Sequence, residues 1–506
     1  MVSASIALNR FGLGARPDDR VTGDPRSWLL DQFARYEPRP PGVAATADTH
    51  AMAAALVDYQ DDRRMIRRQG APGAMPAAGA AAMPAPSPAM ATPVLAPKPG
   101  APDLMTSGTP AAGMDATKLA LRDAREVAAK AIRADYGRAV AARTNAALVT
   151  PAPFVERLVQ FWSNHFAVSI DKLEVIALAG PIEFEAIRPH VLGRFADMLN
   201  AVERHPAMLL YLDQAVSVGP DSPVGLRAAR GQRKVGLNEN LAREILELHT
   251  LGVRTGYGQG DVTEFARAMT GWTVAGLGRG PRGAVTAGDF AFTPAIHQPG
   301  DRTILGKLYP AAGEAQAQAV LADLAVHPAT ATHIATKLAR HFAGDVPPPA
   351  MIARLKKAFL SSGGDLPTVY RAIVASREAW VETPVKFRTP WEWTVASMRA
   401  LGTTTVQPGA ILGLTNQLGQ QVWKPGQPIG YDDLAATWAG PDAIMRRVEA
   451  AERFASRAPA GTDARALAPV LFPGALSDAT AQALDRAESP GQALALLLAS
   501  PEMMRR

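Results

Sequence analysis

Cysteine is absent from all 506 residues of the sequence. Without thiols the chain has no disulfide bond, no thiolate nucleophile and no cysteine ligand for zinc or an iron–sulfur cluster. Any nucleophile, acid or base must therefore come from other side chains. The chain also needs no oxidising compartment in order to fold.

A large excess of one charge is missing as well. The 53 Lys and Arg residues nearly balance the 47 Asp and Glu residues, which leaves a formal net charge of +6. No block of basic residues alternates with aromatic residues. We therefore expect no nucleic-acid partner.

Long apolar runs are also missing. No window approaches the ~20 consecutive apolar residues that a membrane-spanning helix needs. Residues 1–10 do not combine a charged start with a long apolar stretch, so no signal peptide is visible. We predict a chain without a membrane span that is cytoplasmic.

Apolar residues make up 47% of the chain, and most of them recur at the three-to-four-residue spacing of amphipathic helices. The sequence therefore predicts an all-α protein. We expect N-terminal helices in residues 1–69 that pack on a main body, an insert at 70–114, and the main helical body at 115–506.

Two segments interrupt the helical pattern. Residues 70–114 are rich in Ala, Pro, Gly, Met and Ser and carry almost no charge, so they bury too little apolar surface to offset the entropy of ordering. We predict a disordered insert that folding does not require and that limited proteolysis cuts first. Around residues 273–307, Phe290 and Phe292 alternate with smaller residues, which predicts a short β-hairpin.

The most specific segment runs from Asn238 to Gly252 and reads Asn-Glu-Asn-Leu-Ala-Arg-Glu-Ile-Leu-Glu-Leu-His-Thr-Leu-Gly. Asn238 or Asn240 can cap a helix there, and Gly252 can close it. At ~100° per residue, Glu244 falls within an apolar arc, Glu247 lies at its edge and His249 lies on another face. The arc consists of Leu241, Ile245, Leu248 and Leu251.

A carboxylate among leucines is costly unless it is paired or catalytic. One explanation for Glu244 is a buried ion pair with an arginine such as Arg267. The other is a carboxylate whose pKa is raised by burial and which serves as a general acid or base. Glu244→Gln distinguishes the two, because it strands an arginine only in the first case.

Two histidines are further candidates. His165 follows Asn164 and shares a helix face with apolar residues, so it is either a buried, hydrogen-bonded histidine or a functional one. His297 lies in the irregular segment shortly before Asp301, and such polar loops often carry functional sites. His165, His297 and Glu244 could together bind a divalent metal and leave one position open. The sequence indicates no other cofactor.

Several motifs resemble those of one bacterial family. The motifs are Ala7-Leu-Asn-Arg10-Phe-Gly, Phe161-Trp-Ser-Asn-His165-Phe, His205-Pro-Ala-Met-Leu-Leu-Tyr-Leu-Asp213, the Asn238–Gly252 segment, Tyr257-Gly-Gln259-Gly-Asp-Val262, Ala268-Met-Thr-Gly-Trp272 and Lys337-Leu-Ala-Arg-His-Phe342. Through them the chain, apart from its insert, resembles the family called domain of unknown function 1800. The motifs add Asn238, Glu239, His249 and Trp272 to the candidate site residues.

The resemblance also implies a partner. Members of the family are typically encoded beside proteins of the domain of unknown function 1501 type, which resemble sulfatases and phosphatases and often carry export signals. A non-enzymatic binding or maturation role beside such a protein is therefore one prediction of function. The resemblance also implies co-export with such a partner to the periplasm as the alternative to a cytoplasmic location.

The leading prediction is hydrolase-type chemistry on a polymeric or anionic substrate. Glu244 would be the acid or base, and His165, Glu247 and His297 would be its partners. A pocket that joins Glu244, His165 and His297 favours this enzyme, whereas Glu244 buried against an arginine without a cavity favours the binding role.

Overall fold

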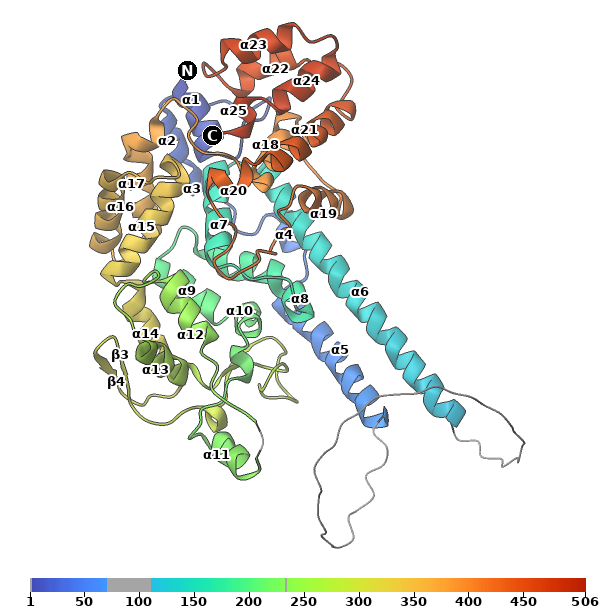
Figure 1. Ribbon diagram of the computed structural model, residues 1–506, viewed down its shortest axis with the longest axis vertical. Coiled ribbons are helices and arrows are strands. Elements are labelled where there is room, and N and C mark those ends of the chain that lie inside the picture. Colours follow the sequence, from blue (N-terminus) through green and yellow to red (C-terminus); the bar gives the residue numbers. More distant parts are fainter. Residues whose placement is uncertain (1, 71–110, 233) are drawn as a thin grey trace, which may run out of the picture. The chain divides into compact units, whose positions relative to one another are not determined.

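The computed structural model describes residues 2–70, 111–232 and 234–506 (Figure 1). Of the predicted insert at 70–114, residues 71–110 lie outside the described residues. Helix α6 begins at Ala111, which is earlier than the start near Asp115 that the sequence predicts.

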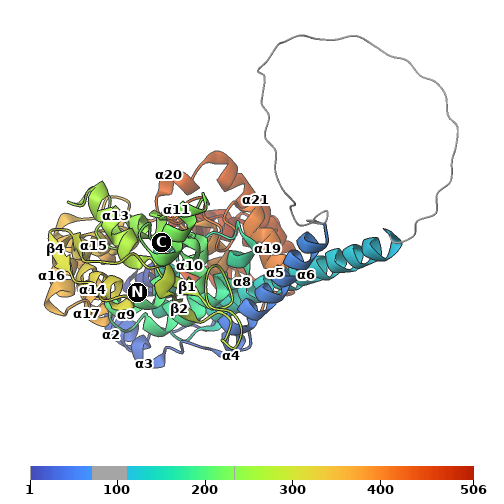
Figure 2. The ribbon, with the colours of Figure 1, turned by 90° about the horizontal axis from the view of Figure 1, so that it is seen from below.

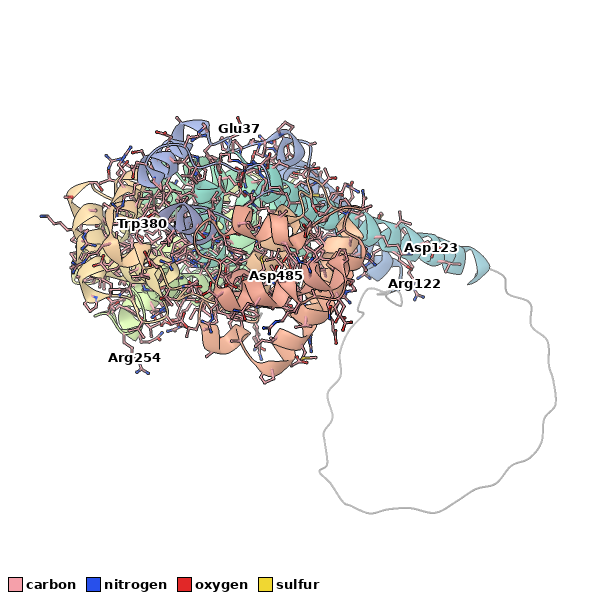
Figure 3. The ribbon with its side chains drawn as sticks, turned by 90° about the horizontal axis from the view of Figure 1, so that it is seen from above. Glu37, Arg122, Asp123, Arg254, Trp380 and Asp485 are labelled. Atoms are coloured by element: carbon pink, nitrogen blue, oxygen red, sulfur yellow. The ribbon has the colours of Figure 1, made fainter. Side chains whose placement is uncertain are left out.

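Two compact units make up the chain. The first contains Met1–Val57 and Ala131–Arg506, and the second contains Asp58–Lys130. The described residues of the second unit belong to two long helices, with Arg122 and Asp123 on α6 (Figure 3). Within it, the Arg125 guanidinium lies over the Tyr59 ring, and its Nε donates to the Tyr59 hydroxyl at 2.9 Å.

Helices dominate the secondary structure of the described residues, which confirms the predicted all-α class. The α-helices up to residue 250 are α1 (Val2–Ile6), α2 (Pro25–Leu30), α3 (Gln32–Arg35), α4 (Pro41–Ala44), α5 (Thr49–Gly70), α6 (Ala111–Val149), α7 (Pro153–His165), α8 (Leu173–Pro181), α9 (Phe195–Glu203), α10 (Pro206–Tyr211), α11 (Pro223–Arg230) and α12 (Asn240–Glu244). Those after residue 250 are α13 (Gln259–Met269), α14 (Glu314–Ala325), α15 (Pro328–Ala343), α16 (Pro349–Ser361), α17 (Leu366–Ala375), α18 (Pro390–Ala400), α19 (Pro408–Gln417), α20 (Ala435–Trp438), α21 (Pro441–Ser456), α22 (Ala464–Leu471), α23 (Asp478–Asp485), α24 (Pro490–Leu498) and α25 (Pro501–Met504).

Short helices of other pitch interrupt this series. The π-helices are η1 (Ala7–Phe11), η2 (Ile182–Ile187) and η5 (Ile245–His249). The 3₁₀-helices are η3 (Arg188–His190), η4 (Gln214–Val216), η6 (Pro294–Ile296) and η7 (Arg377–Trp380). Each π-helix places buried polar side chains in the core, as Arg10, Glu183 and His249 show.

The irregular segment forms two small antiparallel hairpins. Strand β1 (Trp272–Val274) pairs with β2 (Phe290–Phe292), and β3 (Arg302–Ile304) pairs with β4 (Lys307–Tyr309). Strand β1 contacts α10 (Figure 2). The predicted hairpin at 273–307 is therefore confirmed. Trp272 is fully buried with its ring 5.3 Å from that of Phe290, so it is a packing residue of this hairpin.

The core of the first unit is built around α7, where Phe154, Leu158 and Trp162 are fully buried. The N-terminal segment packs on the same unit near its last helices (Figure 1). There, the Asn9 amide donates to the Leu471 carbonyl at 2.9 Å and accepts from Arg388 at 2.9 Å. Buried hydrogen bonds thus connect the N-terminal segment to residues in the last quarter of the chain.

The Asn238–Gly252 segment departs from the expected regular helix. Helix α12 ends at Glu244 and continues as the π-helix η5, whose wider turn shifts the phase of every later side chain. Leu246 is consequently fully buried although it lies outside the predicted arc, and Leu248 is only half-buried. Gly252 closes the segment with φ +93°, as predicted.

The ends of this segment also differ in detail. The N-cap position of α12 is held by Glu239 without a side-chain capping bond, and not by Asn238 or Asn240 as predicted. Asn238 instead accepts from the backbone N–H of Asn240 at 2.9 Å. None of the helices in the described ranges is long and apolar enough to cross a membrane.

Candidate functional site

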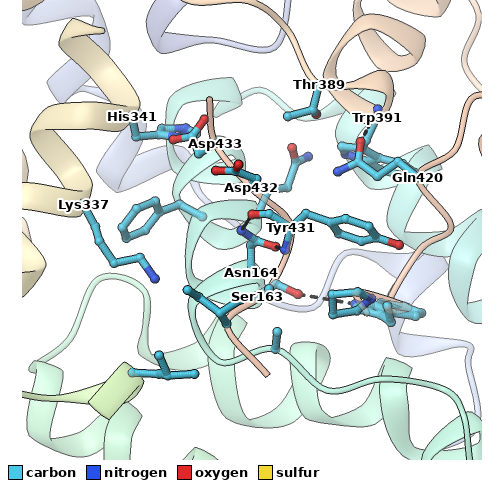
Figure 4. A pocket seen from close by; sticks show the side chains of 18 of the residues that line it. Ser163, Asn164, Lys337, His341, Thr389, Trp391, Gln420, Tyr431, Asp432 and Asp433 are labelled. Carbon is cyan, nitrogen blue, oxygen red and sulfur yellow. Dashed lines mark hydrogen bonds and ion pairs between the residues drawn. The ribbon is translucent and has the colours of Figure 1, made fainter. Parts of the chain in front are cut away.

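A cavity of about 480 Å³ lies in the first unit, lined by α7, η5, α15 and the loop 420–433 (Figure 4). Its volume falls in the range of sites that bind small molecules. These lining segments are far apart in the sequence, so the cavity exists only in the folded chain.

One face of α15 supplies the basic wall of the cavity. His333, Lys337, Arg340 and His341 all line it, because residues spaced by three, four or eight positions share a helix face. Burial, aided by neighbouring positive charges, lowers the pKa of both histidines to about 4. At neutral pH the positive charge of this wall therefore comes from Lys337 and Arg340.

Lys337 contacts the last residue of α7. Its Nζ lies 2.9 Å from Nδ1 of His165, and Nε2 of His165 lies 3.1 Å from the backbone oxygen of His249. Because a carbonyl oxygen only accepts, His165 carries its proton on Nε2, and its Nδ1 accepts from Lys337. His165 is 1% exposed and positions the lysine from behind the cavity wall.

Both groups of this pair have lowered pKa values. Burial, and then the charge of Lys337, hold the pKa of His165 well below its ordinary value, so His165 is neutral. Burial, reinforced by Arg340 and opposed by Asp433, lowers the pKa of Lys337 from 10.5 to about 8. Lys337 can therefore gain or lose a proton close to neutral pH.

The two cations also lack acidic partners. Among the described residues, no carboxylate lies within 4 Å of Lys337 or Arg340, and Nε of Arg340 is buried without a hydrogen-bond partner. Most other charges of the lining are matched: Arg143 pairs with Glu183, and Arg157 with Glu392. Carboxylates of Glu247, Glu392, Asp432 and Asp433 also line the cavity, so what distinguishes Lys337 and Arg340 is that neither forms an ion pair with a described residue.

The opposite wall is the loop 420–433, which Asn164 holds in place. The Asn164 amide donates to the Tyr431 carbonyl at 2.8 Å and accepts from the Tyr431 N–H at 2.7 Å (Figure 4). The preceding Gly430 has φ +85°, and a Cβ there would lie 2.2 Å from the Asn164 carbonyl oxygen. Only glycine allows this close approach.

Buried ion pairs form the floor. Glu392 binds Arg157 and also accepts from Arg506 at 2.9 Å. Asp433 lies 3.0 Å from Nδ1 of His341 and 3.3 Å from Nζ of Lys386. Burial alone would raise the pKa of Asp433, but these neighbours lower it to about 2, so its carboxylate stays charged.

Comparison with known proteins identifies the family. The model of the family described as "Protein of unknown function (DUF1800)" matches residues 6–505. The chain belongs to the DUF1800 family. No curated protein and no solved structure matches it. The resemblance that the motifs indicate is therefore confirmed.

Of the acidic residues predicted for the site of this DUF1800 chain, Glu247 lines the cavity and Glu244 does not. Glu247 lies 3.6 Å from Arg243 on the preceding turn. Glu244 is half-buried and makes no ion pair or hydrogen bond within the described ranges. Burial raises its pKa, as predicted. The alternative of a buried ion pair with Arg267 is wrong, because Arg267 pairs with Glu264.

His249 does not line the cavity but supports a residue that contacts Lys337. It is fully buried and its Nδ1 lies 2.7 Å from Oε1 of Glu203, which is also fully buried. This pair fixes η5, whose backbone oxygen at His249 holds His165. The Nε2 atom of His249 has no hydrogen-bond partner among the described residues.

The predicted metal ligands do not form one site. Nδ1 of His297 donates to the Thr270 carbonyl at 2.6 Å, and Asp301 accepts from the Ala311 N–H at 2.8 Å. Both contacts fix the hairpin region. In the part of the chain that the structure describes, no group of three or more His, Asp or Glu residues could hold a metal ion. His165, His297 and Glu244 therefore form no three-ligand cluster.

The remaining family positions connect helices. Glu239 accepts from the Thr263 hydroxyl at 2.7 Å and from the Gln259 amide at 2.8 Å, which joins α12 to α13. The hydrogen bond from Thr263 is the largest cause that lowers the pKa of Glu239. Glu239 therefore has a structural role outside the cavity.

Sequence reasoning did not select Lys337 and Arg340. Their signal was their place in the Lys337–Phe342 motif that the family shares, together with their helical spacing from His333, which lies before that motif. Basic residues near the end of a helix also interact favourably with its dipole, and that ordinary role hides the signal. What distinguishes these two is the cavity they face, which the sequence does not reveal.

Proposed function

We propose that the cavity performs acid–base chemistry of the hydrolytic kind on an anionic substrate, with Lys337 as the group that exchanges the proton. The observation that supports it is an amine in a cavity, without a carboxylate partner among the described residues and hydrogen-bonded to a neutral imidazole. A general base works best when its pKa lies near the working pH.

Each residue then has a definite role. The neutral amine of Lys337 would take a proton from water as the water oxygen attacks, and the ammonium would return a proton to the leaving group. His165 accepts one N–H of Lys337 and so orients its nitrogen. Arg340 would bind the negative charge of the substrate. Glu247 is a second titratable group on the lining, which takes the place that the sequence assigned to Glu244.

The proposal is tested with chromogenic nitrophenyl esters that carry a phosphate or a carboxylate, beside a neutral acetate ester. We expect the anionic esters to be hydrolysed, with kcat/KM rising through about pH 8 as Lys337 loses its proton. Lys337→Met should lower kcat/KM by a factor of about 100 or more.

The matched control is Lys357→Met, which removes an exposed lysine from α16 outside the cavity. It should leave kcat/KM unchanged. Equal rates for Lys337→Met and the unaltered protein, or a panel in which no anionic ester is hydrolysed, would refute the proposal. The binding or maturation role beside a DUF1501 protein stays a prediction, which copurification tests.

A further inference from the structure

The same cavity also indicates what its ligand looks like. We propose that it binds an anion carried on a single apolar chain, of the size of a medium-chain alkyl carboxylate. This inference rests on the proposed function and names the ligand class of that site. An alkyl carboxylate has no bond to hydrolyse, so it is the anion that the site binds while Lys337 is protonated. Three features carry it: free donors on α15, positive charge beneath the floor, and exposed apolar side chains at the mouth.

Lys337 and Arg340 can bind the anionic head. An ammonium has three N–H donors, and His165 takes one of those of Lys337, so two are left. Arg340, one helical turn away, has a guanidinium that no described carboxylate contacts. A carboxylate accepts several hydrogen bonds, so it can use both cations at once.

Buried arginines add to the attraction. Arg157, Arg388, Arg447 and Arg506 are all buried, and Glu392 is the carboxylate that they share most directly. Burial, followed by the charge of Arg157, lowers the pKa of Arg388 to about 9. These four guanidinium groups outnumber the two carboxylates beside them, Glu392 and Asp433, and the excess positive charge favours an anion in the adjoining cavity.

The mouth and walls fit an apolar body. Val253 is 56% exposed and Ile429 is 54% exposed, and both line the cavity. Deeper in, Phe161 and Trp423 are nearly buried and line it as well. The neighbouring Arg254 projects away from the surface instead (Figure 3). A small inorganic ion would leave these apolar walls in contact with water, whereas an alkyl chain covers them.

Calorimetric titration of the full chain with acetate, butyrate, hexanoate, octanoate and neutral octanol tests the inference. Each added methylene should tighten binding about threefold to fourfold, and octanoate should bind at least about tenfold more tightly than octanol. A flat series would refute the apolar body. Equal binding of octanol and octanoate would refute the anionic head.

Variants locate the ligand in this cavity. Arg340→Met should weaken octanoate binding about tenfold, and the control Arg354→Met, an arginine of α16 that pairs with Glu378, should not weaken it. Val253→Ser with Ile429→Ser should weaken octanoate but not butyrate, and both positions are exposed enough for the fold to tolerate the change. Unchanged octanoate binding in these variants would overturn the assignment.

A sedimentation arm separates a free anion from a lipid surface. If the ligand is a free anion, octanoate binds and the protein does not sediment with vesicles of anionic phospholipid. Vesicle binding without octanoate binding would overturn the inference. The titrations measure binding and the ester panel measures hydrolysis. A failure of the ligand class and a failure of the hydrolytic function can therefore be told apart.

Discussion

Lys337→Met should make the protein respond differently to pH. In the folded state the pKa of Lys337 is about 8, against 10.5 for an unburied lysine. The unfolded chain therefore binds more protons between about pH 8 and 10.5, so the unaltered protein becomes more stable as the pH rises through that window. The methionine variant has no such proton to lose.

The size of this effect follows from the two pKa values. Below about pH 8 the buried ammonium costs about 3 kcal/mol, because burial lowers its pKa from 10.5 to about 8. Between pH 7 and pH 9.5 the unaltered protein should recover about 2 kcal/mol of that cost relative to the variant. Lys337 is not wholly buried, so solvent screening makes this an upper value.

The assay is urea denaturation of both proteins at pH 7 and pH 9.5. The lost hydrogen bond to His165 destabilises the variant at both pH values, so it cancels from the difference. The control Lys357→Met removes an exposed lysine. The difference in stability between this variant and the unaltered protein should be the same at pH 7 and at pH 9.5. If Lys337→Met also shows none, Lys337 is not held in a desolvating cavity and the reasoning about its chemistry fails.

Three further changes test other parts of the structure by thermal or urea denaturation. Glu244→Gln should hardly change stability at neutral pH, because no described arginine pairs with Glu244; a loss of about 3–5 kcal/mol would instead reveal a buried ion pair. Glu392→Gln should cost about 3–5 kcal/mol, because Arg157 and Arg506 lose their counter-charge; a loss below about 1 kcal/mol contradicts this. Gly430→Ala should cost more than about 1 kcal/mol and weaken octanoate binding, since its Cβ would meet Asn164. Gly426→Ala, where a Cβ meets nothing within 4 Å, is its control, and equal behaviour of the two would contradict the role of Asn164.

Local pattern was enough for the fold class and for several details. Helical periodicity predicts the helices, and the alternation of Phe290 and Phe292 predicts a hairpin, because these signals arise from burial within one element. The closure at Gly252 and the raised pKa of Glu244 were predictable for the same reason. Each depends on residues a few positions apart.

The same local reasoning failed where the helix changed pitch. The π-helix η5 shifts the phase of the segment, so Leu246 turns into the core and Leu248 toward the cavity. A π-helical turn bonds residue i to residue i+5, so a fixed angle of about 100° per residue places the later side chains wrongly. Glu247 rather than Glu244 therefore reaches the cavity.

By itself, the sequence determined that the protein is helical, lacks thiol chemistry and belongs with the family whose motifs it shares. Only the tertiary structure decided which polar residues form a site. Lys337 becomes an acid–base candidate because α7, α15 and the loop 420–433 enclose it. These segments bring no described carboxylate within ion-pair distance of its amine and place Nδ1 of His165 2.9 Å from its Nζ. Desolvation and pairing of charge depend on residues distant in the sequence, such as His165 and Asp433, and no local pattern contains them.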